Sequence, residues 1–334
     1  FGLEFARRLM DPVEPLQLGR TFVVPYAPLE FAGVADELSE REPTLTVRLR
    51  STLAAVYREG SRWTGVRGID ADGAFEVSGK TFIDASGDAI GALLAGHATE
   101  EIPPAERQLS SIVFHLQNVE RRLQDRGERV AVLRAIQSAE AAGRLDGCGN
   151  IAFRPTGRRG EVVFKIALGG ISTDGPSPLE TRTEREARRR VRAVASFLRS
   201  EIDGFGASFV SHAAPQVGVR ESRRIIGEYR LTRDDVLCAR HFDDAITEAA
   251  WPIELWSEGR EGPSLEYLPD GATYTIPRRA LRLRDVDNAY GVGRCMSGTP
   301  EALGSARVIG TCLDAGFAIG RIAAGRVGTT EARP

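Results

Sequence analysis

The sequence FIDASGD at residues 82–88 is the stretch that decides the fold class inferred for this chain. Thr81–Asp84 is short and apolar, as expected of a buried strand, and the Ala-Ser-Gly that follows has no bulky side chain. Backbone can approach a ligand closely at such a turn, and Asp88 stands where its carboxylate would accept a hydrogen bond from a ribose or ribityl hydroxyl. Ile90–Leu94 then resembles the start of a helix. The segment therefore suggests a ligand-binding turn between a strand and a helix, with a purely structural turn as the alternative.

A second informative segment is VGRCMSGTPEALGSARVIGTCLDAGFAIGRIAA, residues 292–324. Here Gly304-Ser305-Ala306-Arg307 is predicted to introduce a helix rich in small residues. The N–H groups and dipole at a helix N-terminus stabilise an anion by typically ~0.3–1 kcal/mol. Small residues also let a helix approach a flat ligand or a sheet, so tight helix–sheet packing alone is the alternative.

Other segments have clear secondary-structure patterns. Trp63–Ile69 and Ala74–Val77 flank an Asp-Ala-Asp-Gly turn and predict a hairpin, and the alternation in Leu45–Leu49 predicts another strand. The best helix covers roughly 179–202, where an apolar stripe accompanies seven arginines. These arginines suggest either an anion site or, more ordinarily, a solvated helix face.

Charge and composition exclude several classes of protein. The 334 residues carry 44 Lys and Arg against 46 Asp and Glu, a net charge of −2, which argues against a nucleic-acid or anionic-membrane partner. No apolar run is long enough to cross a membrane and no signal peptide is apparent. Only two of the basic residues are lysine, which codon bias in a GC-rich, presumed bacterial, genome explains. The four cysteines are far apart, which predicts reduced thiols in a cytoplasmic protein: Cys148, Cys238, Cys295 and Cys312.

Common catalytic motifs are absent from the sequence. There is no P-loop, HExxH or GxSxG, and the spacing of His241 from Asp243 and Asp244 is not that of a helix-borne metal-ligand pair, so no metal is predicted. A GxGxxA string occurs at Gly147–Ala152, but it follows AAGRLD rather than a strand. Without the strand–turn–helix context we interpret it as a polar loop and not as a dinucleotide-binding fingerprint.

Together, the two informative segments resemble FAD-dependent oxidoreductases whose flavin domain is like that of glutathione reductase. In this family an IDATGD turn is paired with a C-terminal GRxxSxTHEAxGSxR…GQAAG segment. The middle of the chain is also similar to the family, in GVRESRRIIGEYRLTRDDVL at 218–237, FDDAI at 242–246, WPI at 251–253 and YTIPRRAL at 274–281. The resemblance covers most of the chain from about residue 20 onward.

The resemblance implies an α/β fold with two domains. We expect a partial glutathione-reductase-like, Rossmann-type FAD-binding domain with an inserted α+β substrate domain. Residues 1–102 would form the first part of the FAD-binding domain, 103–285 the substrate domain, and 286–334 the C-terminal part of the FAD-binding domain.

The cofactor implied is FAD, bound in an extended form by separated segments. The residues expected near its phosphate and sugar part are Ala85, Ser86, Gly87 and Asp88. Those expected beside the ribityl chain are Gly293, Arg294 and Cys295. Those expected on the pyrimidine side of the flavin are Gly304, Ser305, Ala306 and Arg307. A helix N-terminus there would stabilise the negative charge of reduced flavin around N1 and O2. Arg220 and Arg307 are the predicted catalytic residues.

Two features depart from the family pattern. Pro300 stands where the family usually has histidine, so any chemistry of that histidine is missing here. The family also opens with a βαβ unit containing GxGxxG, which we expect before Phe1, supplied by a second chain in a heterodimer. The predicted activity is hydride transfer from a small-molecule substrate to flavin N5. The alternatives are a non-catalytic or degenerate flavoprotein subunit and a flavin-dependent monooxygenase.

Overall fold

The computed structural model describes residues 1–10, 14–171, 177–260 and 262–325, and it divides into two compact units. Unit 1 comprises Phe1–Glu101, Arg223–Ile253 and Glu266–Pro334, and unit 2 comprises Ile102–Ser222 and Glu254–Leu265. The first boundary falls beside the expected 102/103. Residues 223–253 and 266–285, expected in the substrate domain, belong instead to unit 1.

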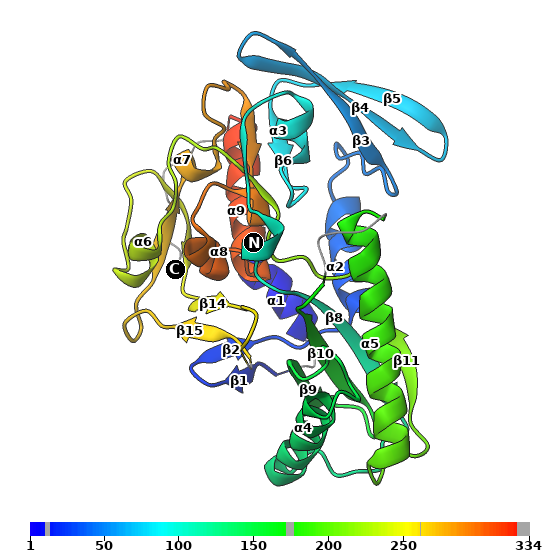
Figure 1. Ribbon diagram of the computed structural model, residues 1–334. Coiled ribbons are helices and arrows are strands. Elements are labelled where there is room, and N and C mark those ends of the chain that lie inside the picture. Colours follow the sequence, from blue (N-terminus) through cyan, green and yellow to red (C-terminus); the bar gives the residue numbers. More distant parts are fainter. Residues whose placement is uncertain (11–13, 172–176, 261, 326–334) are drawn as a thin grey trace. The chain divides into compact units, whose positions relative to one another are not determined.

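Unit 2 is built on a four-stranded antiparallel sheet with strand order β11-β8-β10-β9. Its strands are β8 (Ser110–Gln117), β9 (Ile151–Pro155), β10 (Val162–Leu168) and β11 (Phe209–Ala213). Its helices are the one-turn η1 (Pro104–Glu106), α4 (Arg126–Ala141) and α5 (Leu179–Glu201). Figure 1 shows α4 and α5 beside this sheet.

The core of unit 2 lies between the sheet and these two helices. Alternate residues of β8 are buried, and Phe114 stacks on Phe164 of β10 with ring centroids 5.1 Å apart. The apolar stripe predicted for the long helix is buried against the same cluster, including Val194 and Leu198 of α5. Each such side chain contributes about 1.5–3 kcal/mol when fully buried. The alternating apolar residues of the strand and the apolar stripe of the helix are therefore buried in one core.

Unit 1 contains more and shorter elements. Those before residue 102 are α1 (Gly2–Met10), β1 (Leu16–Leu18), β2 (Thr21–Val23), α2 (Pro28–Glu40), β3 (Thr52–Glu59), β4 (Arg62–Asp70), β5 (Gly73–Ser78), β6 (Phe82–Asp84), α3 (Ile90–Leu94) and β7 (Thr99–Glu101). Those after residue 222 are β12 (Arg223–Ile225), α6 (Arg233–Leu237), β13 (Ala245–Ala249), β16 (Tyr274–Pro277), α7 (Arg278–Leu281), β17 (Ala289–Gly291), η2 (Gly293–Cys295), α8 (Pro300–Ala306) and α9 (Ile309–Ala323). Strands β14 (Ile253–Leu255) and β15 (Ser264–Glu266) pair with each other, and each contains a boundary at which the chain passes from one unit to the other.

The hairpin predicted in unit 1 is present as strands β4 and β5. They pair in register through the turn, with Asp70 opposite Gly73. The strand predicted at Leu45–Leu49 is wrong, because this segment is exposed and not extended into a ladder. Strand β3, which follows it, occupies the other edge of β4, so β4 has no edge left for a further strand.

Strands β6 and β17 form a parallel pair, although they are more than 200 residues apart in the chain. Phe82 lies opposite Ala289, and Asp84 lies opposite Gly291. Because the strands are parallel, both carboxyl ends lie at the same edge, where α/β sheets bind ligands. The FIDASGD strand thus leads to the expected kind of site.

The helix predicted to begin at Gly304–Arg307 begins elsewhere. Thr299 caps α8, its hydroxyl accepting a hydrogen bond from the Ala302 N–H at 3.3 Å, and Pro300 occupies the first helical turn. Residues 304–306 therefore form the last turn of α8, and α9 begins only at Ile309 after a bend of 89°. Pro300 is compatible with this helix because proline is favoured at a first helical position.

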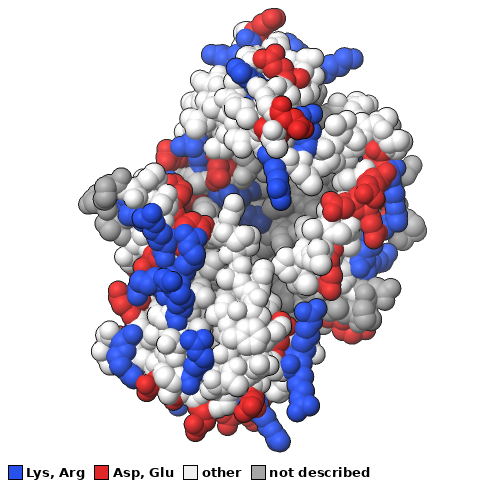
Figure 2. Space-filling model, turned by 90° about the vertical axis from the view of Figure 1, so that its right-hand side faces the viewer, with Lys and Arg blue, Asp and Glu red and all other residues white. Residues whose placement is uncertain are grey.

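Among the helices of the described residues, none has by itself both the length and the apolar character that a membrane span needs, whereas the bent pair α8 and α9 reaches them together. On the face shown in Figure 2, basic and acidic side chains form separate groups of both signs.

Candidate functional site in unit 1

The turn after β6 is held by the carboxylate of Asp84. This side chain is buried and accepts hydrogen bonds from the backbone N–H of Ser86 at 2.9 Å and of Gly91 at 2.8 Å. The Ser86 hydroxyl in turn accepts from the Ile90 N–H at 3.2 Å. Gly91 also has little room for a side chain, because a Cβ would lie 3.0 Å from the Trp63 ring. These contacts fix the backbone of residues 85–88 at the strand end.

The chain leaving β17 meets this turn. The Val292 N–H donates to the Asp84 carbonyl at 3.0 Å, which continues the parallel pairing past the strands. Arg294 then pairs with Asp88 at 2.6 Å, so the two predicted cofactor segments are joined by an ion pair. Gly87 makes this geometry possible, because its φ is +78° and a Cβ there would lie 2.7 Å from the Arg294 guanidinium.

A cavity of about 800 Å³ is found in unit 2, but the smaller cavity of about 560 Å³ in unit 1 lies at these strand ends. The residues that line the unit 1 cavity are Phe1, Ala85, Ser86, Gly87, Val292, Gly293, Arg294, Cys312, Leu313, Gly316 and Phe317. Five of the predicted cofactor residues thus share one cavity, and Asp88 contacts it through Arg294. One face of α9 also lines the cavity, through Cys312, Leu313, Gly316 and Phe317. The small residues of this helix suggested close approach to a ligand or a sheet, but they did not single out these four positions.

Cys295 belongs to the core behind the cavity rather than to its wall. It is fully buried in a cluster with Trp63 and Ala289, and its thiol donates to the carbonyls of Asp84 at 3.5 Å and Val292 at 3.3 Å. Burial raises the pKa of Cys295 to about 12. The side chain is therefore a neutral thiol that supports the strand ends.

Gly304, Ser305 and Ala306 are buried within unit 1 and do not line this cavity. The Ser305 hydroxyl lies 2.8 Å from the Tyr274 hydroxyl and donates to the Trp251 carbonyl, which anchors α8 to the neighbouring segments. Burial also raises the pKa of Tyr274, so this network stays uncharged. Arg307 is the C-cap of α8. The helix N-terminus expected at these residues is not there, because they end α8; the next N-terminus is that of α9 at Ile309, which no side chain caps among the described residues.

Arg220, the other predicted catalytic residue, lies in unit 2. It is almost fully buried, donates a hydrogen bond to the Leu109 carbonyl, and stacks over the Trp256 ring at 4.8 Å. Lys165 from β10 lies over the same ring at 3.9 Å. A cation held by an aromatic face has a fixed position, so Arg220 is part of a rigid cluster in unit 2.

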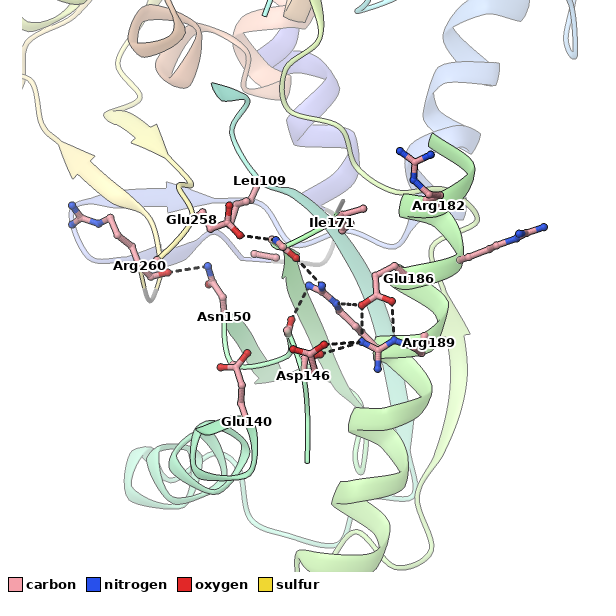
Figure 3. A pocket seen from close by; sticks show the side chains of 18 residues that line it. Leu109, Glu140, Asp146, Asn150, Ile171, Arg182, Glu186, Arg189, Glu258 and Arg260 are labelled. Atoms are coloured by element: carbon pink, nitrogen blue, oxygen red, sulfur yellow. Dashed lines mark hydrogen bonds and ion pairs between the residues drawn. The ribbon is translucent and has the colours of Figure 1, made fainter. Parts of the chain in front are cut away.

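The cavity of unit 2 is polar and rich in charge (Figure 3). It is lined in part by the loop that contains the GxGxxA string at Gly147–Ala152. In this loop the Asn150 side chain donates to the Arg260 carbonyl at 3.0 Å, and nearby Glu258 accepts from the Gly170 N–H at 2.7 Å. Loop Gly147–Ala152 leads into strand β9 and not into a helix, which agrees with its interpretation as a polar loop.

The charges at the centre of this cavity pair with one another. Glu186 accepts hydrogen bonds from Arg189 at 2.6 Å and from Arg190 at 2.7 Å, which lower the pKa of Glu186 to about 2. Arg190 is buried and donates also to the carbonyls of Gly147 at 2.8 Å and Gly169 at 2.7 Å. The arginines around Glu186 therefore tie three segments of unit 2 together.

The unit 1 site fits the part of FAD that the sequence predicts for it. Gly87 and Gly293 both have positive φ, of +78° and +71°, and leave backbone exposed where a side chain would fill the space. Arg294 contributes a positive charge to the cavity wall, and α9 contributes Cys312, Leu313, Gly316 and Phe317. Backbone N–H groups, a cation and small residues are what a phosphate and a flat ring require.

Comparison with known proteins identifies the family of the chain. Residues 1–332 match the model of a family described as FAD dependent oxidoreductase. None of the curated protein sequences matches the chain.

Several solved structures are also similar to the chain. They include the flavin-dependent brominase Bmp2, with 13% identity, 91% of this chain and 57% of that chain covered, and a TM-score of 0.42. A geranylgeranyl bacteriochlorophyll reductase-like protein from Thermoplasma acidophilum has 11% identity, coverages of 93% and 58%, and a TM-score of 0.43. The anhydrotetracycline hydroxylase OxyS from Streptomyces rimosus has 12% identity, coverages of 97% and 54%, and a TM-score of 0.42. The chain spans a little over half the length of each.

The match to the family model covers nearly the whole chain, and the predicted cofactor segments converge at the ends of two parallel strands. The expected α/β fold with a Rossmann-type flavin domain and the expected cofactor are confirmed. The chain belongs to the family of FAD-dependent oxidoreductases, which are enzymes that use FAD.

Proposed function

We propose that this protein oxidises a small organic substrate by hydride transfer to N5 of FAD. The observation that carries the proposal is the meeting of residues 85–88 with residues 292–294 around one cavity, joined by the Asp88–Arg294 ion pair. When it is bound, FAD supplies the hydride acceptor. The chain's own residues have to hold it, orient it and present the substrate.

The residues of the cavity divide these tasks by their chemistry. Arg294 supports binding of the phosphate and sugar part, because its guanidinium lies over the backbone of Gly87 and faces the cavity. Asp88 keeps that guanidinium in place and offers a carboxylate oxygen to a sugar hydroxyl. The uncapped N-terminus of α9 would stabilise negative charge on a reduced ring.

We place the substrate on unit 2, with Arg220 as the residue that binds it. This assignment is supported by the rigid setting of Arg220 between the Leu109 carbonyl and the Trp256 ring. A guanidinium in a fixed position recognises a carboxylate or another anionic group of a substrate with little loss of entropy.

We further propose that a βαβ unit with the GxGxxG pattern, carried by a second chain, extends the parallel pair. Within the described residues β6 pairs with β17 on one side only, and Ile83 in the middle of β6 is 39% exposed. A two-stranded parallel pair is unusual by itself, because parallel sheets are normally larger and covered on both faces. The open edge of β6 supports addition of a further parallel strand there.

A flavin-binding experiment tests the proposal. The full-length protein is purified with whatever accompanies it, its visible spectrum and intact masses are recorded, and FAD is titrated into Asp88→Asn and Arg230→Met variants. Arg230 is a suitable control because it forms an exposed ion pair with Glu100 in the same unit. We expect a flavin spectrum, a second small polypeptide, and FAD affinity about tenfold lower for Asp88→Asn only.

A colourless protein that takes up no FAD, even with a GxGxxG-bearing partner, would contradict the proposal. A bound flavin that is reduced only by a nicotinamide cofactor and then consumes O₂ with the substrate would favour the monooxygenase alternative. A bound flavin that no reductant reduces would favour the non-catalytic alternative.

A further inference from the structure

Asn288 connects three segments of unit 1 through its side chain. It is the residue directly before β17 and is only 4% exposed. Its Oδ1 accepts a hydrogen bond from the backbone N–H of Trp63 at 2.9 Å. Its Nδ2 donates to the carbonyl of Trp63 at 2.8 Å and to the carbonyl of Lys80 at 2.9 Å. The amide thus binds β4 on one side and the chain entering β6 on the other.

The backbone around Asn288 strengthens the same connection. The Asn288 carbonyl accepts a hydrogen bond from the N–H of Phe82, the first residue of β6, at 2.9 Å. The neighbouring Asp287 binds Ser61 twice, through its N–H at 3.0 Å and its carboxylate at 2.7 Å. Residues 287–288 therefore join the β3–β4 hairpin, β6 and β17 at the start of the parallel pair.

Only an amide satisfies all partners of this side chain. The Trp63 N–H requires an acceptor, and the two carbonyls require donors. A carboxylate offers acceptors alone, and an aliphatic side chain offers neither. A buried carbonyl that loses its donor has no water to replace it, so the loss is costly.

We propose that Asn288 is a positioning residue for the cofactor site. It sets the register of β6 against β17 at their beginning, and this register determines where residues 85–88 and 292–294 emerge at their end. Strands this short, of three residues each, have few ladder hydrogen bonds to hold their own register. Asn288 itself does not line the cavity. Its role rests on the proposed binding of FAD at these strand ends.

The substitution Asn288→Asp tests this role because it conserves shape and changes only the donors. At a pH at which the new side chain is ionised, its carboxylate would face the two carbonyl oxygens and could donate a hydrogen bond to neither. At lower pH a protonated carboxyl regains one donor, so the defect should shrink. His97, whose ring accepts a hydrogen bond from the Trp63 indole at 2.9 Å, and Asp287, which binds Ser61, are the same in both proteins, so the wild type at each pH is the reference.

Unit 2 offers a matched control. Asn150 also bridges backbone with its amide, donating to the Arg260 carbonyl at 3.0 Å and accepting from the Gly262 N–H at 3.3 Å. We would measure the dissociation constant of FAD for the full-length wild type, Asn288→Asp and Asn150→Asp at pH 8 and pH 5.5. We expect Asn288→Asp to weaken binding by roughly tenfold or more at pH 8, with part of the loss recovered at pH 5.5. Asn150→Asp should leave FAD binding unchanged at both values.

Hydrogen exchange without FAD provides a second measurement. Peptides that cover 82–84 and 289–291 should exchange at least several-fold faster in Asn288→Asp than in the wild type at pH 8, and Asn150→Asp should not change them. If Asn288→Asp does not fold, Asn288→Ser is the second variant. It introduces a neutral hydroxyl that can donate one hydrogen bond and places no charge beside the two carbonyls, so its effect on the same peptides should be smaller.

The outcomes separate the inference from the proposed function. A wild type that binds no FAD contradicts the proposed function, and hydrogen exchange then still decides the role of Asn288. FAD affinity and exchange that are the same in the Asn288 variants and in the wild type, or changed equally by the Asn150 substitution, would overturn the inference.

Discussion

The two cavities of this protein differ in what their polar groups do. The cavity of unit 2, about 800 Å³, is the larger and carries more charged side chains, yet the central ones bind one another. The cavity of unit 1, about 560 Å³, is lined mainly by backbone and small or apolar residues at the ends of two strands. Its cation, Arg294, pairs with Asp88 at the wall.

This difference shows that a collection of charges is not by itself a binding site. In unit 2 the buried guanidinium of Arg190 donates to the carbonyls of Gly147 and Gly169 and so holds their loops together. Its removal would leave these carbonyls without that donor. In unit 1 the ends of two parallel strands bring backbone of residues 85–87 and 292–294 to the wall of the cavity. Parallel strand ends and glycines are therefore the better support for the proposed cofactor site.

Substitution of Arg190 should have the largest effect and should be confined to unit 2. Arg190→Met leaves the carbonyls of Gly147 and Gly169 without a donor, and we expect unit 2 to lose about 3–5 kcal/mol of stability. Hydrogen exchange of unit 2 peptides in denaturant measures this loss. The control is Arg188→Met, whose exposed ion pair with Glu184 should contribute less than about 1 kcal/mol. Equal effects of the two substitutions would mean that Arg190 does not tie the loops.

Acidification should weaken unit 2 through Glu186. The hydrogen bonds from Arg189 and Arg190 lower the pKa of Glu186 from 4.5 to about 2, so the folded state favours the charged form. The resulting stabilisation is fully present above pH 4.5 and is lost as the pH falls towards 2; we expect it to be of order 2 kcal/mol. Glu186→Gln should remove this pH dependence from the unfolding of unit 2. A slope that persists in the variant would assign it to other carboxylates.

A smaller effect, and one confined to unit 1, is expected for Gly87→Ala. Gly259, which lines the unit 2 cavity, is the matched control. Gly87 and Gly259 both have positive φ, of +78° and +72°, so alanine causes similar backbone strain of about 1 kcal/mol at either position. At Gly87 the new Cβ also displaces the Arg294 guanidinium from Asp88, whereas nothing lies within 4 Å at Gly259. FAD titration should show weaker binding, by several-fold, for Gly87→Ala only. Equal FAD affinities in both variants would contradict a role for the Asp88–Arg294 pair.

Much of the local structure was predictable from the sequence. The strand and turn at 82–88, the hairpin around Asp70–Gly73 and the long helix α5 are all present where their patterns indicated. In each case the signal is contained in neighbouring residues, as an apolar period or a turn composition. The family resemblance added the second half of the site, at 293–295, which no local pattern connects with residue 85.

The site residues that could not be predicted depend on contacts between distant segments. Ser305 was expected beside the flavin. Its hydroxyl contacts the Tyr274 hydroxyl and the Trp251 carbonyl, which anchors α8. Cys295 shares the motif of Arg294 and yet points into the core. Asn288 has no motif at all, and its partners lie more than 200 residues away in the chain.

The sequence alone determined the α/β class, the family and the two segments that would meet the cofactor, because turns and strand lengths are properties of short stretches. Only the tertiary structure decided which of those residues face the cavity, that α8 and α9 are separate helices, and that Glu186 in the charged cavity of unit 2 is paired with two arginines. The physical reason is that a side chain's direction and its free hydrogen-bonding groups depend on what packs against it. In this chain those partners come from segments far apart in sequence.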